Sequence, residues 1–349
     1  MSQSSDLLYH QLRIASISEG PVGFKTFTFS GDHGLTYKSG QYLTIVHNHQ
    51  EASDIRRSYS ICSCPDINEP LTIGVKRIDN GMLSRNLNDN SHIGDLLLTT
   101  GIGGMFTLPQ DTRDYNTVVF FAAGSGITPV ISLIKSVLHS QPHLHAVLIY
   151  SNHSEATTIF YRELMELQVQ FASRFQIEFL FSRIADLHRA RLNRDLLLQI
   201  LNTYASDKEH TLFFVCGPQA YMRMIIYTLN EQLYPPNCYR KEDFIPIKPS
   251  QRITPPDQTT RRVRIFLKGA ELQFPVEFPD PITVAAKKSN IQLPYSCETG
   301  KCGSCVAKCV EGKVWMSDNE VLMDEDLKQG LVLTCVGHPN GGDITLIID

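Results

Sequence analysis

Four of the nine cysteines in this chain follow a spacing that is typical of a [2Fe-2S] cluster. Cys297, Cys302 and Cys305 form the pattern C-x4-C-x2-C, and Cys335 follows after 29 further residues. Three thiolates from one loop and a fourth from another segment can hold two bridged irons. The alternatives are buried structural thiols or a zinc site, but a zinc ribbon needs a second C-x2-C pair. The spacing therefore predicts a cluster near the C-terminus.

The charge of the chain is small and is concentrated in its C-terminal part. Among 349 residues, 36 acidic and 32 basic side chains give a net charge of −4. From Val263 onward, 12 acidic and 8 basic residues account for all of this charge. No basic patch suggests nucleic-acid binding. An acidic surface that carries a redox cluster suggests a docking face for a protein partner, with a solvated surface as the alternative.

One uncharged stretch, residues 115–134, is long enough to span a membrane. Its central Gly-Ser-Gly and Thr-Pro favour instead a buried strand, a tight turn and the start of a helix. The N-terminal residues lack the features of a secretory signal. Because cluster ligands have to be reduced thiolates, we expect a cytoplasmic protein without a membrane span.

The length of the chain fits two or three domains, and the sequence pattern changes three times along it. Short alternating strands with turn residues between them predict an antiparallel β-barrel in residues 1–112. Strands and helices alternate in residues 113–243, which predicts a parallel α/β domain with ligands at the carboxyl edge of its sheet. Residues 244–262 contain four prolines and predict a linker. Residues 263–349 predict a small β-rich domain.

Two turns in the predicted α/β domain are suited to a nucleotide. The motif Gly124-Ser125-Gly126-Ile127-Thr128-Pro129 follows a predicted strand and opens a helix. Its glycines let the backbone approach a pyrophosphate, and the helix N-terminus offers free N–H groups. Cys216-Gly217-Pro218 ends another predicted strand and should lie at the same sheet edge. A tight turn with a buried cysteine is the alternative.

Two motifs in the predicted barrel are suited to a flavin. In Arg57-Ser58-Tyr59-Ser60 the arginine can pair with a phosphate, the tyrosine can stack on a ring and a serine hydroxyl can reach a flavin nitrogen. Gly81-Met82-Leu83-Ser84 follows the strand at 71–77 and begins a short helix, which is a second phosphate-binding arrangement. The two motifs together suggest a dinucleotide flavin.

These motifs resemble those of the ferredoxin–NADP⁺ reductase superfamily, and the cysteine pattern resembles that of plant-type ferredoxins. The order of barrel, nucleotide domain, linker and ferredoxin is similar to that of oxygenase reductases such as those of phenylacetyl-CoA epoxidase and 3-ketosteroid 9α-hydroxylase. Glu242-Asp243-Phe244 and Gly312-Lys313-Val314-x-Met316 also resemble motifs of that group. The resemblance implies a β-grasp-like ferredoxin domain.

The resemblance implies a reductase that passes electrons from NADH or NADPH to FAD, then to the cluster and then to a partner oxygenase. It places Ser60 near the flavin N5, and Cys216 and Glu242 beside the nicotinamide. The implied flavin contacts are Arg57, Ser58, Tyr59, Ser60, Val75, Lys76, Gly81, Met82, Leu83, Ser84 and Phe244, and the implied nicotinamide-nucleotide contacts are Gly124, Gly126, Thr128, Pro129, Arg183, Cys216, Gly217 and Pro218.

One departure from the family pattern concerns the choice of nucleotide. Relatives often have Asn-Arg after the second strand of the nucleotide domain, whereas this chain has Asn152-His153. Arg183 is a candidate replacement for binding an adenosine 2′-phosphate, because a guanidinium suits a phosphate. A solvated loop arginine is the alternative. Two other functions stay open, a stand-alone NAD(P)H:acceptor reductase and a redox-sensing interaction protein.

Overall fold

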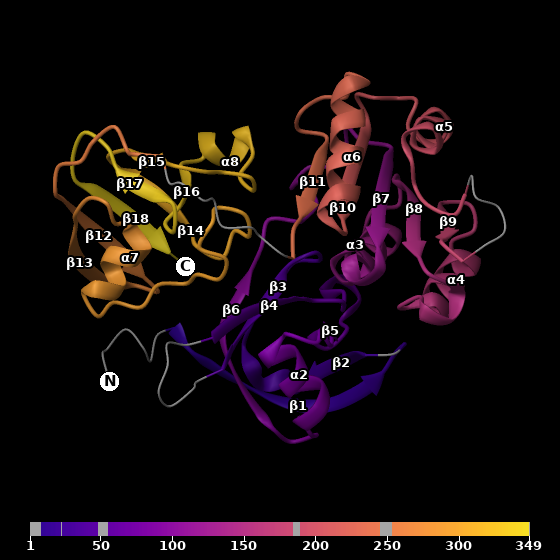
Figure 1. The fold of residues 1–349 in the computed structure, drawn as a ribbon, viewed down its shortest axis with the longest axis horizontal. Coiled ribbons are helices and arrows are strands. Elements are labelled where there is room, and N and C mark those ends of the chain that lie inside the picture. The colour runs from indigo at the N-terminus through magenta and orange to yellow at the C-terminus, as the bar shows by residue number, and fades with distance from the viewer. Residues whose placement is uncertain (1–7, 22, 48–54, 184–188, 245–252, 349) are drawn as a thin grey trace.

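The computed structural model describes residues 8–21, 23–47, 55–183, 189–244 and 253–348, which form three units, each built on a sheet of five or six strands (Figure 1). In Figure 1 the N-terminal unit lies at the bottom, the central unit at the upper right and the C-terminal unit at the left. The sheet types confirm the predicted fold class of antiparallel barrel, parallel α/β unit and β-grasp-like unit.

The N-terminal unit is an antiparallel sheet with the strand order β4-β3-β6-β1-β2-β5. Its two end strands approach each other through a bridge between Ile61 and Ile73, so the sheet curls into a partly closed barrel. Inward side chains such as Phe27 and Leu43 fill its core. The elements are β1 (His10–Glu19), β2 (Phe24–Phe29), η1 (Gly31–His33), β3 (Tyr42–His47), β4 (Ile55–Ser60), η2 (Pro65–Ile67), β5 (Thr72–Lys76), α2 (Met82–Asn90) and β6 (Leu96–Gly103).

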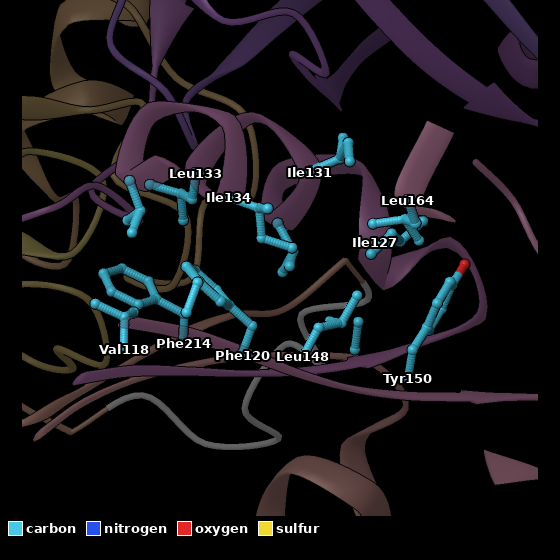
Figure 2. Packing of buried hydrophobic residues seen from close by; sticks show 14 of the residues in the cluster. Val118, Phe120, Ile127, Ile131, Leu133, Ile134, Leu148, Tyr150, Leu164 and Phe214 are labelled. Atoms are coloured by element: carbon cyan, nitrogen blue, oxygen red, sulfur yellow. The ribbon is translucent and has the colours of Figure 1, made fainter. Parts of the chain in front are cut away.

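The central unit is a parallel sheet with the strand order β11-β10-β7-β8-β9. Alternate residues of its strands face opposite sides, so α3 and α4 cover one face and α5 and α6 the other. Figure 2 shows the first of these layers, in which Phe120 and Phe214 of the sheet face Leu133 and Ile134 of α3. The elements are β7 (Thr117–Ala123), η3 (Gly124–Gly126), α3 (Ile127–Ser140), β8 (His145–Asn152), η4 (Glu155–Thr157), α4 (Tyr161–Gln170), β9 (Phe175–Phe181), α5 (Arg194–Tyr204), β10 (Thr211–Cys216), α6 (Gln219–Glu231) and β11 (Tyr239–Glu242).

The C-terminal unit is a mixed sheet with the strand order β13-β12-β18-β14-β16, in which β12 and β18 are parallel, and a two-stranded ribbon of β15 and β17 lies beside it. Helix α7 packs on the sheet through Ile282 and Ala286. The elements are β12 (Arg261–Leu267), β13 (Ala270–Val276), α7 (Ile282–Lys288), β14 (Val306–Glu311), β15 (Val314–Met316), α8 (Asp324–Lys328), β16 (Leu331–Leu333), β17 (Gly337–Pro339) and β18 (Ile344–Ile348).

Helix α3 joins the central unit to the barrel. The Ser132 hydroxyl donates to the carbonyl oxygen of Ser63 (2.6 Å), and the Lys135 ammonium pairs with Glu69 (3.0 Å). A Cβ atom on Gly74 of β5 would lie 2.7 Å from Cγ2 of Thr128, so only glycine allows this approach. The uncharged stretch 115–134 forms β7 and the start of α3 as predicted, and no helix in the described ranges is long and apolar enough to cross a membrane.

Candidate electron-transfer site

The four predicted cluster ligands meet at one end of the C-terminal unit. Cys297, Cys302 and Cys305 lie on the loop between α7 and β14, and Cys335 follows β16. The Cys297 thiol interacts with the thiols of Cys302 and Cys335, and that of Cys335 also interacts with Cys305, so the four side chains lie close together. Thr334 joins the two segments, because its N–H and its hydroxyl both donate to the carbonyl oxygen of Cys305, at 3.0 and 3.1 Å.

The thiols fit the demands of a two-iron cluster. Interactions among the thiols lower the pKa of Cys297 and, together with burial, raise the pKa values of Cys302 and Cys335, so these side chains lie close enough to share one group of ligands. Gly300 and Gly303 adopt positive φ angles of 76° and 78°, so the loop turns twice between its cysteines. In the described residues no group of three or more His, Cys, Asp or Glu side chains is arranged for a single metal ion. A [2Fe-2S] cluster does not need three or four ligands around one point, because its four thiolates are divided between two irons.

A cavity of about 600 Å³ lies where the three units meet. The barrel contributes Tyr42 and strand β4, the central unit contributes the end of β11, and the C-terminal unit contributes the cluster loop. The cavity therefore brings predicted flavin residues and predicted cluster ligands to one space. From the predicted set, the lining includes Arg57, Ser58, Ser60, Glu242, Phe244, Cys297 and Cys302.

Within this cavity, Ser60 and Glu242 form a hydrogen-bonded pair. The Ser60 hydroxyl donates to Oε1 of Glu242 at 2.7 Å. Burial raises the pKa of Glu242 to about 7, and the hydrogen bond from Ser60 opposes this shift. The carboxyl group can therefore hold or release a proton near neutral pH.

Cys216 lies beside this pair but is buried behind it. The residue is 1% exposed and pairs with Glu242 in the register of β10 and β11. Burial first, and then the charges of Glu242 and Asp243, raise the pKa of the Cys216 thiol well above its usual range. The thiol is therefore neutral at physiological pH and is not a nucleophile.

Three further predicted flavin residues, Tyr59, Val75 and Lys76, lie on β4 and β5, the two outermost strands of the barrel sheet. Tyr59 is half-buried on β4 and packs against the barrel core. Val75 and Lys76 end β5, where Val75 is fully buried and Lys76 is exposed. The lining of the cavity, as far as it belongs to described residues, includes none of these three.

The motif 81–84 forms the predicted start of a helix. Gly81 caps α2, and the Ser84 hydroxyl donates to the carbonyl oxygen of Gly81 at 3.1 Å. A Cβ atom on Gly81 would lie 2.4 Å from this hydroxyl, so a larger residue there would have to displace the Ser84 side chain. Met82 is exposed at the helix start, whereas Leu83 is buried in the barrel core. The free N–H groups of this helix start are available for a phosphate.

The two predicted nucleotide turns lie against each other at the carboxyl edge of β7 and β10. A Cβ atom on Gly126 would lie 2.2 Å from the carbonyl oxygen of Cys216, and one on Gly217 would lie 3.0 Å from Cβ of Ala123. The Thr128 hydroxyl donates to the carbonyl oxygen of Ser125 at 2.9 Å. Glycine at these positions thus lets both turns face one ligand. Gly124 has a φ angle of 55°, Pro129 lies in the first turn of α3, and Pro218 caps α6.

Arg183 lies at the same edge, beside the loop that follows β8. It follows β9 and donates its backbone N–H to the carbonyl oxygen of His153, which follows β8 (3.1 Å). The Nδ1 atom of His153 lies 3.1 Å from the Ser182 hydroxyl. The Arg183 side chain is exposed. It is therefore accessible to a nucleotide that crosses this edge.

The structure adds contacts across the cavity that the sequence analysis did not predict. Tyr42 on β3 contacts the cluster loop, and Ser58 bonds to Ser296 beside Cys297 (2.9 Å). The Arg56 guanidinium lies 4.0 Å from the ring centroid of Tyr295. No local motif predicts these contacts, because the contacting residues are more than 200 positions apart in the chain.

Part of the acidic surface that suggested a docking face is used within the molecule. Glu320 forms ion pairs with Lys241 of β11 and with Lys301 of the cluster loop. Asp326 lies 4.0 Å from Arg240, also on β11. These acids face the central unit, so a partner protein does not meet them as free charges.

Three family models match successive parts of the chain. They describe an oxidoreductase FAD-binding domain at residues 13–108, an oxidoreductase NAD-binding domain at 120–226 and a 2Fe-2S iron-sulfur cluster binding domain at 265–340. Together with the meeting of their sites, these domains define an iron–sulfur flavoprotein oxidoreductase that binds FAD, NAD(P)H and a [2Fe-2S] cluster.

Relatives over nearly the full length narrow this class. The ferredoxin reductase component of 3-ketosteroid-9-alpha-monooxygenase from Rhodococcus rhodochrous is 32% identical over 94% of this chain and 93% of its own. A component of 1,2-phenylacetyl-CoA epoxidase from Escherichia coli is 27% identical over 98% of each chain. The chain belongs to the family of reductase components of oxygenase systems, as its motifs predicted.

Solved structures support the fold. Phthalate dioxygenase reductase is 22% identical, with a TM-score of 0.60 over 99% of this chain and 100% of its own. An intact type IV self-sufficient cytochrome P450 monooxygenase has a TM-score of 0.71 at 19% identity, over 97% of this chain and 41% of its own. The second structure joins the same three-unit fold to a larger polypeptide.

Proposed function

We propose that this chain takes electrons from NAD(P)H at its central unit and passes them through FAD and the [2Fe-2S] cluster to a partner oxygenase. The observation that carries the proposal is the shared cavity, whose walls include Ser60 and Glu242 as well as Cys297 and Cys302. FAD, when bound, supplies the conversion of a two-electron hydride into single electrons that a cluster can accept. The protein supplies placement and charge.

Each proposed role follows from a position in this site. Ser60 would meet the reacting edge of a bound flavin, and Glu242, which accepts the hydrogen bond of Ser60, would hold a proton beside it. Cys216, as a buried neutral thiol beside Glu242, would support the nicotinamide side of the site. Phe244 is 46% exposed at the cavity wall, where its ring is free to cover the flavin face. The start of α2 at Gly81 binds the flavin pyrophosphate, which favours FAD over FMN because FMN lacks the second phosphate.

Four further assignments belong to this proposal. We infer NADPH as the preferred donor from the accessible Arg183, and an oxygenase as acceptor from the names of the relatives. We infer a cytoplasmic location because all nine cysteines are free thiols and cluster assembly needs reduced ligands. The proposed domains are 1–112, 113–243 and 263–349, with a linker at 244–262, of which residues 245–252 lie outside the described part of the chain.

The decisive experiment separates the two halves of the electron path. The purified holoenzyme should contain FAD, iron and sulfide, and anaerobic NAD(P)H should bleach first the flavin and then the cluster absorbance in a stopped-flow experiment. Cys335→Ser should lose the cluster spectrum while it keeps flavin reduction by NAD(P)H within about twofold. The reason is that Cys335 lies in the C-terminal unit, away from the nucleotide turns.

Cys309→Ser is the matched control, because Cys309 is a thiol of the same unit whose hydrogen bond goes to the carbonyl oxygen of Glu311 (3.4 Å). It should keep both the cluster and flavin reduction. A Cys335→Ser protein that retains a normal [2Fe-2S] spectrum, or a folded one that no longer reduces its flavin, would overturn the proposed path.

A further inference from the structure

Tyr42 connects the barrel directly to the backbone of the cluster loop. The residue lies on β3 and is 4% exposed. Its hydroxyl oxygen lies 2.6 Å from the carbonyl oxygen of Cys302, to which it donates, and 2.7 Å from Oγ of Ser304. Because the hydroxyl has a single proton, Ser304 must be the donor in the second bond. Both bonds reach residues 302–304, which lead from one proposed cluster ligand, Cys302, to the next, Cys305.

The barrel backbone is shaped to hold this ring. A Cβ atom on Gly103 would lie 3.0 Å from Cε2 of Tyr42, and one on Gly104 would lie 2.9 Å from Cε1. On the other side of the contact, a Cβ atom on Gly303 would lie 3.1 Å from Cγ of Met105. The ring and the cluster loop thus pack closely against one barrel segment, and the hydroxyl has little freedom to leave its position.

We propose that Tyr42 is a positioning residue that holds the cluster loop at the flavin cavity and thereby sets the rate of flavin-to-cluster electron transfer and the reduction potential of the cluster. The inference rests on the proposed electron path. Each transfer moves one electron from the bound flavin to the oxidised cluster, adds one negative charge beside Cys302 and forms no bond to Tyr42. Electron tunnelling falls steeply with distance, so the docking of this loop controls its rate.

The same hydrogen bond affects the potential for an electrostatic reason. The proton of the Tyr42 hydroxyl points to the Cys302 carbonyl oxygen and partly cancels the negative end of that dipole next to the cluster. Hydrogen bonding near a cluster favours its reduced form, which carries one more negative charge. Removal of the hydroxyl should therefore lower the reduction potential.

Other contacts hold the opposite end of the loop. Ser58 bonds to Ser296, and Arg56 lies over the ring of Tyr295. Both contacts are therefore made with residues that precede Cys297 in the loop. Tyr42 bonds to the backbone of Cys302, a proposed ligand, and to Ser304, which follows it in the loop. The two sets of contacts are therefore separable, and loss of the Tyr42 hydroxyl alone should not release the whole unit.

The test compares Tyr42→Phe with Tyr37→Phe in the holoenzyme. Tyr37 is a matched control, because its hydroxyl bonds within the barrel, to Ser63 (2.8 Å). In anaerobic stopped-flow experiments with NAD(P)H, Tyr42→Phe should reduce the flavin-to-cluster rate, relative to flavin reduction, by about fivefold, as expected for one lost hydrogen bond. An EPR-monitored redox titration should show a lower cluster potential. Tyr37→Phe should change neither.

The outcomes are distinct. A Tyr42→Phe protein with the wild-type transfer rate and the wild-type potential would overturn the role of Tyr42 and leave the electron path intact. A wild-type protein in which NAD(P)H bleaches the flavin but never the cluster would instead overturn the path. If Tyr42→Phe does not assemble a cluster, Ser304→Ala removes the second of the two bonds and keeps the bond to Cys302, and an unchanged transfer rate in that variant would contradict the role of Tyr42 in holding the loop.

Discussion

At the scale of single residues, Glu242 has an environment that links stability to pH. Its carboxyl group lines the cavity and accepts a hydrogen bond from Ser60, but burial still raises its pKa from 4.5 to about 7. Between these two values the folded protein keeps a proton that the unfolded chain releases. The resulting stabilisation is complete below pH 4.5 and is lost as the pH rises through about 7.

We therefore expect Glu242→Gln to abolish this part of the pH dependence. Relative to the variant, the wild-type holoenzyme should lose up to about 3 kcal/mol of unfolding free energy between pH 5 and pH 8. Urea unfolding at the two pH values measures this difference. Exposed Glu277, changed to Gln, is the control and should leave the wild-type pH dependence in place. Parallel pH profiles for wild type and Glu242→Gln would show that the carboxyl does not titrate near neutrality.

At the scale of the elements, we expect the loops after β8 and β9 to influence which nucleotide is preferred. Arg183 and His153 lie side by side there through a backbone hydrogen bond, and the Arg183 side chain is exposed. If its guanidinium binds a 2′-phosphate, Arg183→Ala should raise the KM for NADPH roughly tenfold or more and leave that for NADH unchanged. Steady-state kinetics with ferricyanide as acceptor provide the measurement.

Arg162→Ala is a suitable control for this experiment. Arg162 is also exposed in the central unit but pairs with Glu166 on its own helix (2.9 Å), so its loss should affect neither nucleotide. Equal changes in the two KM values for Arg183→Ala would identify Arg183 as an ordinary solvated residue.

The elements also show what a sequence can reveal. The turn at Gly126, the helix start at Gly81 and the cysteine loop were predictable, because their backbone demands are met by residues that are adjacent in sequence. The contact of Tyr42 with Cys302 was not predictable, because these two residues are 260 positions apart and no periodic pattern relates them. Part of the predicted linker is also attached to the C-terminal unit, because Asp257 accepts a hydrogen bond from the backbone N–H of Gly341 (2.9 Å).

At the scale of the whole molecule, an acidic residue that the sequence suggested for partner docking instead forms ion pairs between the central and C-terminal units. The acidic residues after residue 317 suggested a surface for a partner, but Glu320 binds Lys241 of the central unit and Lys301 of the cluster loop. Asp324 and Glu325 are exposed. Charge reversal at these two exposed acids thus tests partner docking, whereas a change at Glu320 tests the internal contact.

The internal contact should make electron transfer within the molecule sensitive to salt. Glu320→Gln removes the charge that joins Lys241 to Lys301, and a partly exposed ion pair of this kind is worth about 0.2–1 kcal/mol. We expect the flavin-to-cluster rate in the variant to fall by up to about fivefold at low salt. The wild-type rate should approach that of the variant as salt screens the pair. Stopped-flow traces across a salt series, recorded without any partner protein, measure both effects.

Glu271→Gln is the matched control for this prediction, because Glu271 pairs with Arg264 within the C-terminal sheet (3.5 Å). It should follow the wild-type salt dependence. If Glu320→Gln also follows it, the three-residue bridge does not govern the docking of the cluster loop. The hydrogen bonds of Tyr42 and Ser58, which depend little on salt, would then be the contacts that hold the cluster at the flavin cavity.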